Sequence, residues 1–395
     1  MTPLITYRLG QIADVQQGYT FKPDYQGQSC GEWAYVKVAD IGSPTSSKYL
    51  RKSLNYVSSE VLREMRATPF PAGSIVFPRV GAALRNNNKR ILAEDCLTDD
   101  NVLVVTVRDA NVCDPEYLYY WFDFHDLQDF CNSGTVPVIN GRNLKLQEVP
   151  LPDIQLQRRT ASVLSAWDTA IETTERLIAA KERFHRWLQQ RLIEQRAARH
   201  HWETQELGGL IRERSERSIQ HDEYPVLTSS RRGLFLQSEY FSKQVTSEDN
   251  TGYKIMRRGD FTFRSMSDDG RFVFNRLEKY DTGIISPAYG VFYAEGVCPE
   301  FLAHYLNSNY FAQLLARETQ GGTRKALRFS ALASMEVELP KRADQERIAA
   351  ILNESHREID LLQTQLEILR RQKRGLMQKL LTGVWRVPVP EEITG

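Results

Sequence analysis

Apolar residues recur between residues 347 and 380 at an alternating spacing of four and three positions. The positions of this register are Ile348, Leu352, Ser355, Ile359, Leu362, Leu366, Leu369, Lys373, Leu376 and Leu380, of which only Ser355 and Lys373 are polar. A period of 3.5 residues held over more than four heptads predicts a long helix that packs along a partner helix.

The same register occurs a second time, 188 positions earlier in the chain. Its positions are Thr160, Leu164, Trp167, Ile171, Thr174, Ile178, Lys181, His185, Leu188 and Leu192. This copy contains fewer apolar residues, but its phase is the same. Two copies of one long helix, each preceded by a larger segment, indicate an internal duplication.

The segment before the first long helix has patterns typical of strands and of one further helix. Alternating or continuous apolar runs predict three strands, and a proline suited to the first helical turn predicts a helix. The expected elements are strands at Trp33–Ile41, Gly73–Phe77 and Val102–Val107, a helix beginning at Pro115 and covering Glu116–Phe130, and the long helix from about Gln155 to about Arg199.

The segment before the second long helix repeats these features in the same order. Arg258–Arg264 resembles Ala72–Pro78, Pro299–Leu302 resembles Pro115–Leu118, Leu339-Pro340 resembles Leu151-Pro152, and Gln345–Ile348 resembles Gln157–Thr160. The spacing near the helices is constant, while the spacing within the globular segments varies. The helices are therefore expected to be a shared frame on which two globular units differ.

Composition limits the class of protein only loosely. A net charge of +1 over 395 residues means that any nucleic-acid binding requires Lys and Arg concentrated on one face. Five widely spaced cysteines, Cys30, Cys96, Cys113, Cys131 and Cys298, predict buried, reduced thiols. Without a secretory pattern in residues 1–20 or a long apolar run, the expected location is the cytoplasm.

Motifs of catalysis are absent from the sequence. It contains no phosphate-binding glycine loop, no H-E-x-x-H pattern and no paired Cys/His cluster. Ser286-Pro287-Ala288-Tyr289 departs from the base-binding motif of amino-methyltransferases at Ala288, and a turn before a strand explains it better. We therefore expect no catalytic residue and no bound metal in this chain.

Polar, basic loops that contain glycine or asparagine occur at equivalent places in both repeats. Arg and Asn side chains suit the hydrogen-bonding edges of guanine and adenine, and Lys and Arg also attract phosphate. A single loop of this kind is most simply a solvated turn, but matching loops in both repeats favour contact with DNA. The candidate DNA-binding residues are Arg79, Arg85, Asn86, Asn87, Asn88, Lys89, Arg90, Thr135, Asn140, Arg142, Asn143, Lys145, Ser230, Arg231, Arg232, Arg264, Ser267, Arg271, Thr323, Arg324 and Lys325.

These features together resemble the specificity subunit of type I restriction–modification systems over essentially the whole chain. The strongest features are the two Leu-Pro…Gln…Arg segments that begin the long helices, at Leu151–Arg158 and Leu339–Arg347, and the closing segment Gln372–Gly383. The strand at Gly73–Phe77 with Arg79-Val80-Gly81, and the loop Gly321–Lys325, are also similar to that family. Thr160, Thr174 and His185 in the helix register depart from it.

The resemblance implies an α+β fold in which two α/β target recognition domains are separated by two long antiparallel helices that form an intramolecular coiled coil, with a pseudo-two-fold internal repeat. It divides the chain into recognition domain 1 at 1–152, a central helix at 153–200, recognition domain 2 at 201–340, a distal helix at 341–383 and a tail at 384–395. Each domain would read one half of a split DNA sequence, and the helices would fix the separation of the two halves.

The resemblance also implies the partners. Two methyltransferase subunits that bind S-adenosylmethionine would modify adenine, and restriction subunits that use ATP and Mg²⁺ would join them, while this chain binds no cofactor itself. Two alternatives stay open from the sequence: a coiled-coil scaffold that binds only proteins, and a specificity subunit that serves a methyltransferase without a restriction partner. A self-contained methyltransferase or nuclease is disfavoured because cofactor and metal motifs are missing.

Overall fold

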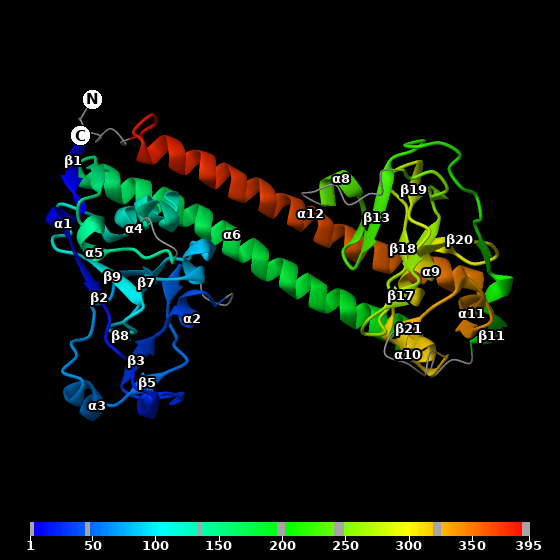
Figure 1. The fold of residues 1–395 in the computed structure, drawn as a ribbon, viewed down its shortest axis with the longest axis horizontal. Helices are drawn as coiled ribbons and strands as arrows, with labels where there is room; N and C mark the ends of the chain where they lie inside the picture. The colour runs from blue at the N-terminus through cyan, green and yellow to red at the C-terminus, as the bar shows by residue number, and fades with distance from the viewer. Residues whose placement is uncertain are drawn as a thin grey trace, which may run out of the picture. The chain divides into compact units, whose positions relative to one another are not determined.

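The computed structural model describes residues 4–43, 48–132, 136–195, 202–240, 249–318 and 325–388, without the side chains of Glu318 and Lys325. The chain forms two compact units (Figure 1). Unit 1 comprises Met1–Arg176 and Thr364–Gly395, and unit 2 comprises Leu177–Gln363. These units group residues differently from the five segments expected along the chain, so that division stays a prediction.

Two long helices contribute residues to both units. Helix α6 covers Ile154–Gln189 (36 residues) and continues into a π-helical turn, η4, at Gln190–Glu194, and helix α12 covers Arg342–Leu381 (40 residues). Residues 196–199 of the expected first helix lie outside the described residues. Every position of the two heptad registers is buried or half-buried. Among the described residues, no helix combines the length and the apolarity that crossing a membrane requires.

Within each unit the parts of α6 and α12 run antiparallel. In unit 1, Asp168 pairs with Lys373 at 2.6 Å and Glu175 pairs with Arg370 at 2.6 Å. Residue numbers therefore increase along α6 in the direction in which they decrease along α12. In unit 2, Lys181 pairs with Glu358 at 2.6 Å, and the later α6 residues Leu188, Leu192 and Ile193 share a core cluster with the earlier α12 residues Ile348 and Leu352.

Unit 1 contains a five-stranded sheet of order β2-β9-β6-β7-β4, a three-stranded sheet of order β5-β3-β8 and the pair β1-β10. Its elements before α6 are β1 Ile5–Arg8, α1 Leu9–Ile12, β2 Ala13–Gln17, η1 Pro23–Tyr25, β3 Trp33–Val36, α2 Val38–Ile41, β4 Tyr49–Leu50, β5 Tyr56–Val57, α3 Ser59–Glu64, β6 Ile75–Pro78, η2 Ala82–Asn86, β7 Arg90–Leu92, β8 Leu97–Thr98, β9 Val102–Val107, α4 Pro115–Phe124, η3 Leu127–Phe130, α5 Gly141–Leu144 and β10 Glu148–Leu151.

Unit 2 contains sheets of order β12-β20-β16-β18 and β14-β13-β19-β15, and the pairs β11-β22 and β17-β21. Its elements between the long helices are β11 Glu203–Glu206, η5 Leu207–Gly209, β12 Ile211–Glu213, β13 Val226–Ser230, β14 Gly233–Leu236, α8 Gln237–Tyr240, β15 Lys254–Arg257, β16 Phe261–Arg264, β17 Met266–Ser267, β18 Asn275–Arg276, β19 Thr282–Ile285, β20 Tyr289–Ala294, α9 Pro299–Leu306, α10 Asn309–Glu318, β21 Lys325–Ala326, α11 Phe329–Ala333 and β22 Glu336–Leu339.

The strand registers show that the two units are structural repeats. In unit 1, β6 pairs antiparallel with β9 so that Pro78 lies opposite Val102, and in unit 2, β16 pairs antiparallel with β20 so that Arg264 lies opposite Tyr289. The parallel pair β3–β8 corresponds in the same way to the parallel pair β13–β19. The duplication expected from the sequence therefore extends to the sheets.

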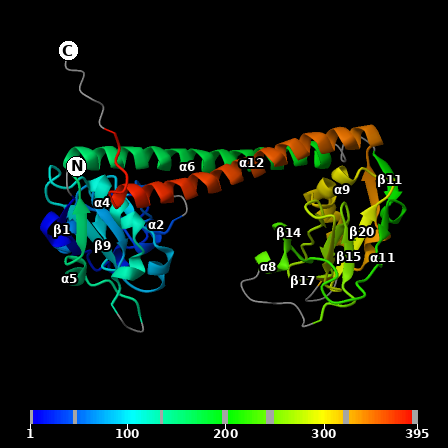
Figure 2. The same ribbon diagram turned by 90° about the horizontal axis from the view of Figure 1, so that it is seen from above.

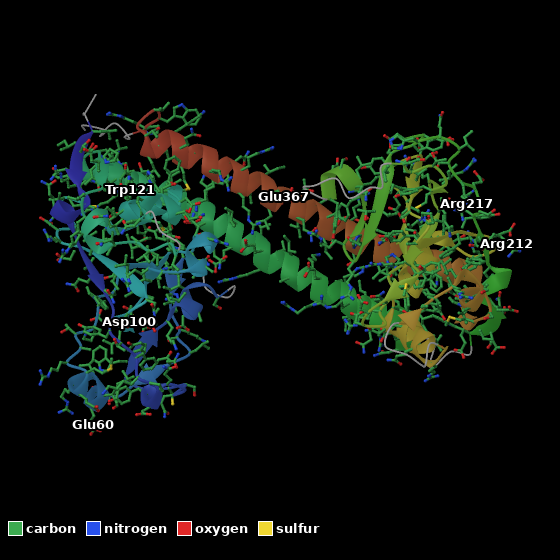
Figure 3. The ribbon with its side chains drawn as sticks, viewed as in Figure 1. Glu60, Asp100, Trp121, Arg212, Arg217 and Glu367 are labelled. Atoms are coloured by element: carbon green, nitrogen blue, oxygen red, sulfur yellow. The ribbon has the colours of Figure 1, made fainter. Side chains whose placement is uncertain are left out.

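Helix α4 links the sheet of unit 1 to its long helices. Its residues Tyr117 to Phe122 are all buried, and they share one core cluster with strands β6 and β9, with Leu164 of α6 and with Leu380 of α12. Figure 2 shows α4 between α6 and the sheet that contains β9, and Figure 3 labels Trp121 on this helix. This layering fixes the sheet, and the loops at its strand ends, relative to the helices within the unit.

Three expectations of local structure were wrong. The predicted strand at Trp33–Ile41 ends at Val36, because the buried carboxylate of Asp40 accepts hydrogen bonds from Lys37 N–H (2.7 Å) and Leu54 N–H (2.9 Å) and stabilises a helical turn there. The predicted helix Glu116–Phe130 ends at Phe124, and Asp126 caps a separate 3-10 turn, η3. Cys30 is exposed and Cys131 half-buried rather than buried, although all five cysteines are free of disulfides.

Candidate nucleic-acid interface

Two basic loops of unit 1 are joined by backbone hydrogen bonds. The N–H of Ile139 donates to the carbonyl oxygen of Arg79 at 2.9 Å, and the N–H of Gly81 donates to that of Pro137 at 3.0 Å. Gly81 has φ +81°, a left-handed conformation that favours glycine and turns the chain into η2. The loops 79–90 and 136–145, which lie far apart in sequence, therefore form one surface at the end of β6.

The equivalent loops of unit 2 are joined by the equivalent bond. The N–H of Leu327 donates to the carbonyl oxygen of Ser265 at 2.9 Å, and β17 pairs with β21 so that Ser267 lies opposite Lys325. Ser265 follows β16 as Arg79 follows β6. The structure thus places a pair of basic loops at the same point of both repeats.

The first loop of unit 1 offers some of the expected side chains to solvent. Arg85 and Asn86 are exposed at the end of η2. Arg79 and Asn88 are half-buried, and the Nε atom of Arg79 is buried and has no hydrogen-bond partner in the described part of the chain. Arg85 and Asn86 are accordingly the best-placed side chains of this loop for contact with a ligand.

Lys89, Asn87 and Arg90 of the same loop make hydrogen bonds within unit 1, and their contact with DNA stays a prediction. Lys89 is 1% exposed, and its ammonium donates to Asn87 Oδ1 at 2.7 Å and to the carbonyl oxygen of His125 at 2.8 Å. Burial lowers the pKa of Lys89 to about 8. Asn87 has φ +53° and also accepts from Leu127 N–H. The half-buried Arg90 donates to the carbonyl oxygen of Lys89 at 2.8 Å.

The second loop of unit 1 presents polar side chains from α5. Asn140 is the N-cap of α5, because its side-chain oxygen accepts from Arg142 N–H at 2.9 Å. Arg142 and Asn143 are exposed, and Asn143 donates to the side chain of Asn132 at 3.0 Å. Lys145 is half-buried, with its Cβ close to Gly10. Thr135 lies outside the described residues.

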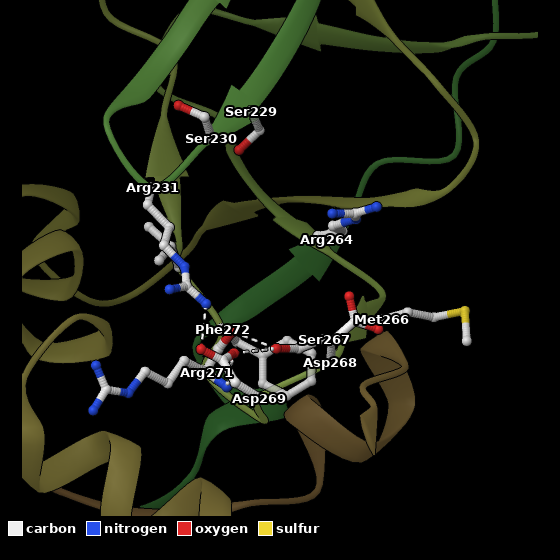
Figure 4. Close-up of a pocket in the computed structure, with 11 residues that line it drawn as sticks. Ser229, Ser230, Arg231, Arg264, Met266, Ser267, Asp268, Asp269, Arg271 and Phe272 are labelled. Atoms are coloured by element: carbon white, nitrogen blue, oxygen red, sulfur yellow. Dashed lines mark hydrogen bonds and ion pairs between the residues drawn. The ribbon is translucent and has the colours of Figure 1, made fainter. Parts of the chain in front are cut away.

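The loops of unit 2 enclose a cleft of about 310 Å³ (Figure 4). The side chain of Arg264, at the end of β16, is exposed. Met266 is 48% exposed, and Figure 4 shows its side chain extending to the same side of the cleft as that of Arg264. The lining residues are Ser229, Ser230, Arg231, Arg264, Met266, Ser267, Asp268, Asp269, Arg271, Phe272 and Val273.

Asp269 interacts with three other residues that line this cleft. Its Oδ1 atom accepts from Ser267 Oγ at 3.0 Å and from Arg271 N–H at 3.2 Å, and its Oδ2 atom forms an ion pair with Arg231. The hydrogen bond from Arg231, assisted by those from Arg271 and Ser267, lowers the pKa of Asp269 to about 2. Arg231 is therefore partly neutralised, while Arg264 and the exposed side chain of Arg271 contribute positive charge.

The other candidates of unit 2 are less well defined as ligand contacts. Ser230 Oγ accepts from Arg232 N–H at 3.1 Å, and the exposed Arg232 lies over the ring of Tyr240. Thr323 and Arg324 lie outside the described residues, as does the side chain of Lys325. Figure 3 labels further arginines of unit 2, but Arg212, for example, is already paired with Glu295 at 2.9 Å.

Sequence reasoning missed Asp269 and Met266. An aspartate in a basic loop and a methionine beside a strand end have no pattern of their own, and only the cleft reveals them. The Ser286–Tyr289 segment is a turn before β20, as expected, since Tyr289 N–H donates to the Ser286 carbonyl oxygen at 3.0 Å. In the part of the chain that the structure describes, no group of three or more His, Cys, Asp or Glu residues is arranged to hold a metal ion.

The chain contains two repeats of a mixed sheet-and-helix domain. Each repeat has a pair of basic loops and packs on antiparallel parts of the two long helices. This arrangement defines a duplicated recognition protein. The chain belongs to the type I restriction–modification DNA specificity family. The family model, described as "Type I restriction modification DNA specificity domain", matches residues 4–182 and 201–371, once for each repeat. Recognition of a DNA target is the role of this family.

Individual relatives agree with this assignment. The type I restriction enzyme MjaVIII specificity subunit of Methanocaldococcus jannaschii is 21% identical over 306 residues, which are 68% of this chain and 70% of that protein. The S subunit of the type I restriction–modification system of M. genitalium has a similar fold, with a TM-score of 0.59 at 13% identity over 96% of this chain and 99% of that one. A chain from a structural study of complex assembly and conformational transition in the type I R-M system has a TM-score of 0.53 at 16% identity, over 96% and 97% of the two chains.

Proposed function

We propose that this chain reads a bipartite DNA target, with one half-site contacted by the paired loops of each unit. The observation that carries the proposal is the equivalent joining of two basic loops at Arg79 in unit 1 and at Ser265 in unit 2. Cationic and amide groups that suit phosphates and base edges come from Arg85, Asn86 and Arg142 in unit 1 and from Arg264 and its neighbours in the cleft of unit 2. Two similar but non-identical loop pairs would read two different half-sites.

The two long helices would set the length of the non-contacted spacer. A helix of 36 residues is roughly 54 Å long at ~1.5 Å per residue, which is about one and a half turns of duplex DNA. The heptad registers that hold α6 against α12 give these helices the stiffness that a fixed spacer requires.

Catalysis would reside in partner subunits. We propose that two methyltransferase subunits, using S-adenosylmethionine, modify adenine within the target, and that restriction subunits, using ATP and Mg²⁺, cleave unmodified DNA. This chain would then contribute target recognition without a catalytic residue or cofactor of its own. A specificity subunit that serves a methyltransferase alone would have the same structure.

Single-molecule sequencing of adenine methylation tests the proposal directly. Cells that express the partner methyltransferase with and without this chain are compared, and a methylated motif with two specific halves and a fixed gap is expected only with it. A motif that is continuous, or that is unchanged when this chain is removed, would contradict the proposed function. A gel-shift assay with the methyltransferase present separates DNA binding from a purely protein-binding scaffold.

A further inference from the structure

The two units use different chemistry at one equivalent place where a recognition domain meets the long helices. Tyr120 of α4 and His304 of α9 each lie five positions after the proline that begins their helix. Asp168 and His356 lie 188 positions apart in the long helices, as do His185 and Lys373. The trio Tyr120, Asp168 and Lys373 of unit 1 therefore corresponds to the trio His304, His356 and His185 of unit 2.

In unit 1 this place holds a lysine that is paired with two carboxylates. Lys373 Nζ lies 2.6 Å from Asp168 and 3.1 Å from Asp123, and Tyr120 Oη donates to Asp168 at 2.6 Å. Burial of Lys373 opposes its positive charge, but Asp123 and Asp168 outweigh that effect and raise its pKa. In unit 1 the buried ammonium of Lys373 is therefore balanced by two carboxylates.

In unit 2 the same place holds three imidazole rings. The ring centroid of His185 lies 6.0 Å from that of His304 and 5.8 Å from that of His356. Nδ1 of His185 is buried and has no hydrogen-bond partner among the described residues, while Nε2 of His304 lies 2.7 Å from Asn353 Oδ1. Burial, together with the positive charge that His304 and His356 would carry, lowers the pKa of His185 to about 4, and burial lowers that of His304 as well.

Among the described residues, the charged groups that face the cluster do not supply a buried counterion for His185. On α6, Arg186 adds positive charge. On α12, Asp360 lies 3.8 Å from His356 with both side chains 62% exposed, and Glu358 is already paired with Lys181. The neighbouring contact between α6 and α9 is an uncharged hydrogen bond, in which the side chain of Gln189 donates to the backbone oxygen of His304. Protonation of His185 would therefore place a positive charge beside Arg186 and two further imidazole rings.

We propose that His185, His304 and His356 are positioning residues that form a protonation-sensitive joint between the recognition part of unit 2 and its helices, whereas Lys373, Asp168 and Tyr120 form an ion-paired joint in unit 1. The proposal rests on the proposed function, because its consequence is that acid weakens the reading of the half-site assigned to unit 2 before that assigned to unit 1.

The expected size follows from proton linkage. An imidazole that titrates near 4 in the closed joint and near its ordinary value of about 6.5 in an opened joint binds protons preferentially in the opened form. The closed state is thus favoured at neutral pH and loses stability as the pH falls below about 6.5. Between pH 7.5 and 5.5 the population of the opened form rises about tenfold.

Hydrogen exchange of the full chain with its methyltransferase partner, corrected for the intrinsic pH dependence of exchange, measures this opening. Peptides from α9 and the adjoining turns of α6 and α12 in unit 2 are expected to exchange about tenfold more readily at pH 5.5 than at pH 7.5. Peptides from α4 in unit 1 are expected to change little. Equal responses of the two units, or no response in unit 2, would overturn the proposal.

Substitutions separate the joint from general acid sensitivity. The triple variant H185K/H356D/H304Y transfers the unit 1 trio into unit 2 and is expected to remove the pH response, and H185Q, a smaller change, is expected to reduce it strongly. H221Q, at a histidine that is half exposed in a surface loop, is the matched control and should keep the response. A response that persists in H185Q contradicts the joint even if the triple variant does not fold. Absence of DNA binding at pH 7.5 would instead contradict the proposed function, and it leaves the exchange result interpretable.

Discussion

Gln157 and Gln345 make the same two hydrogen bonds in the two units. Gln157 Nε2 donates to the carbonyl oxygen of Pro152 at 2.8 Å, and its Oε1 accepts from the N–H of Asp114 at 2.9 Å. Gln345 bonds Pro340 and Cys298 at the same distances. In each unit one buried amide ties the start of the long helix to the end of a strand and to the start of the proline-initiated helix.

Replacing Gln157 with Ala is therefore expected to destabilise unit 1 by roughly 2–4 kcal/mol, because the half-buried N–H of Asp114 and the buried carbonyl oxygen of Pro152 lose their partners. Urea unfolding followed by hydrogen exchange measures the loss, which should be concentrated in unit 1. Q345A should have the corresponding effect in unit 2. Q363A, at an exposed position of α12, is the control, and an equal effect there would contradict a specific role for the two buried amides.

The sequence revealed the recurrence of this arrangement but not its cause. The repeated Leu-Pro…Gln pattern and the heptad registers depend on local spacing, so they predicted the duplication and the long helices. The hydrogen bond between Gln157 and Asp114 joins residues 43 positions apart, a separation on which no local pattern depends. The same limit explains the strand expected at Trp33–Ile41, because the buried Asp40 that ends it acts partly through the distant Leu54.

Arg85 and Arg264 offer a test of independent half-sites. We expect R85A to weaken recognition of one half-site and R264A to weaken recognition of the other. If the guanidinium contacts a base, the binding free energy of that half-site should fall by about 1–3 kcal/mol. If it contacts phosphate, the slope of log affinity against log salt concentration should fall by about one. Competition binding against targets altered in one half at a time distinguishes these outcomes. R324A and K325A should affect the same half-site as R264A, and loss of discrimination at both halves in any one variant would count against separate reading.

Substitution of Lys89 tests whether this residue stabilises unit 1 or contacts DNA. Because its ammonium bonds Asn87 and the His125 carbonyl oxygen inside unit 1, K89A is expected to reduce stability by about 1–3 kcal/mol and to leave DNA affinity of the folded protein unchanged. Thermal unfolding and a salt titration of DNA binding measure the two effects. A lower salt dependence in K89A than in the parent chain would show that Lys89 contacts phosphate after all.

The contrast between Lys89 and Arg85 shows why the candidate site was only partly predictable. Both belong to one basic, Asn-rich run, and composition alone gives them equal weight. The left-handed turn at Asn87 separates them, since it leaves Arg85 exposed and directs Lys89 into the interior. Such a turn depends on the contact between Asn87 and Leu127, which only the folded chain brings together.

The length of α6 and α12 gives the last prediction. Inserting one heptad into each helix, after Arg176 and after Gln363, keeps the 3.5-residue register and lengthens both helices by about 10 Å. The spacer of the preferred target should then grow by about three base pairs at ~3.4 Å each, while both half-sites stay the same. Binding to a library of spacer lengths measures the optimum. An insertion in α6 alone is the control, because it breaks the pairing of the registers and should reduce affinity at every spacer length. An unchanged optimum in the double insertion would show that helix length does not set the spacer.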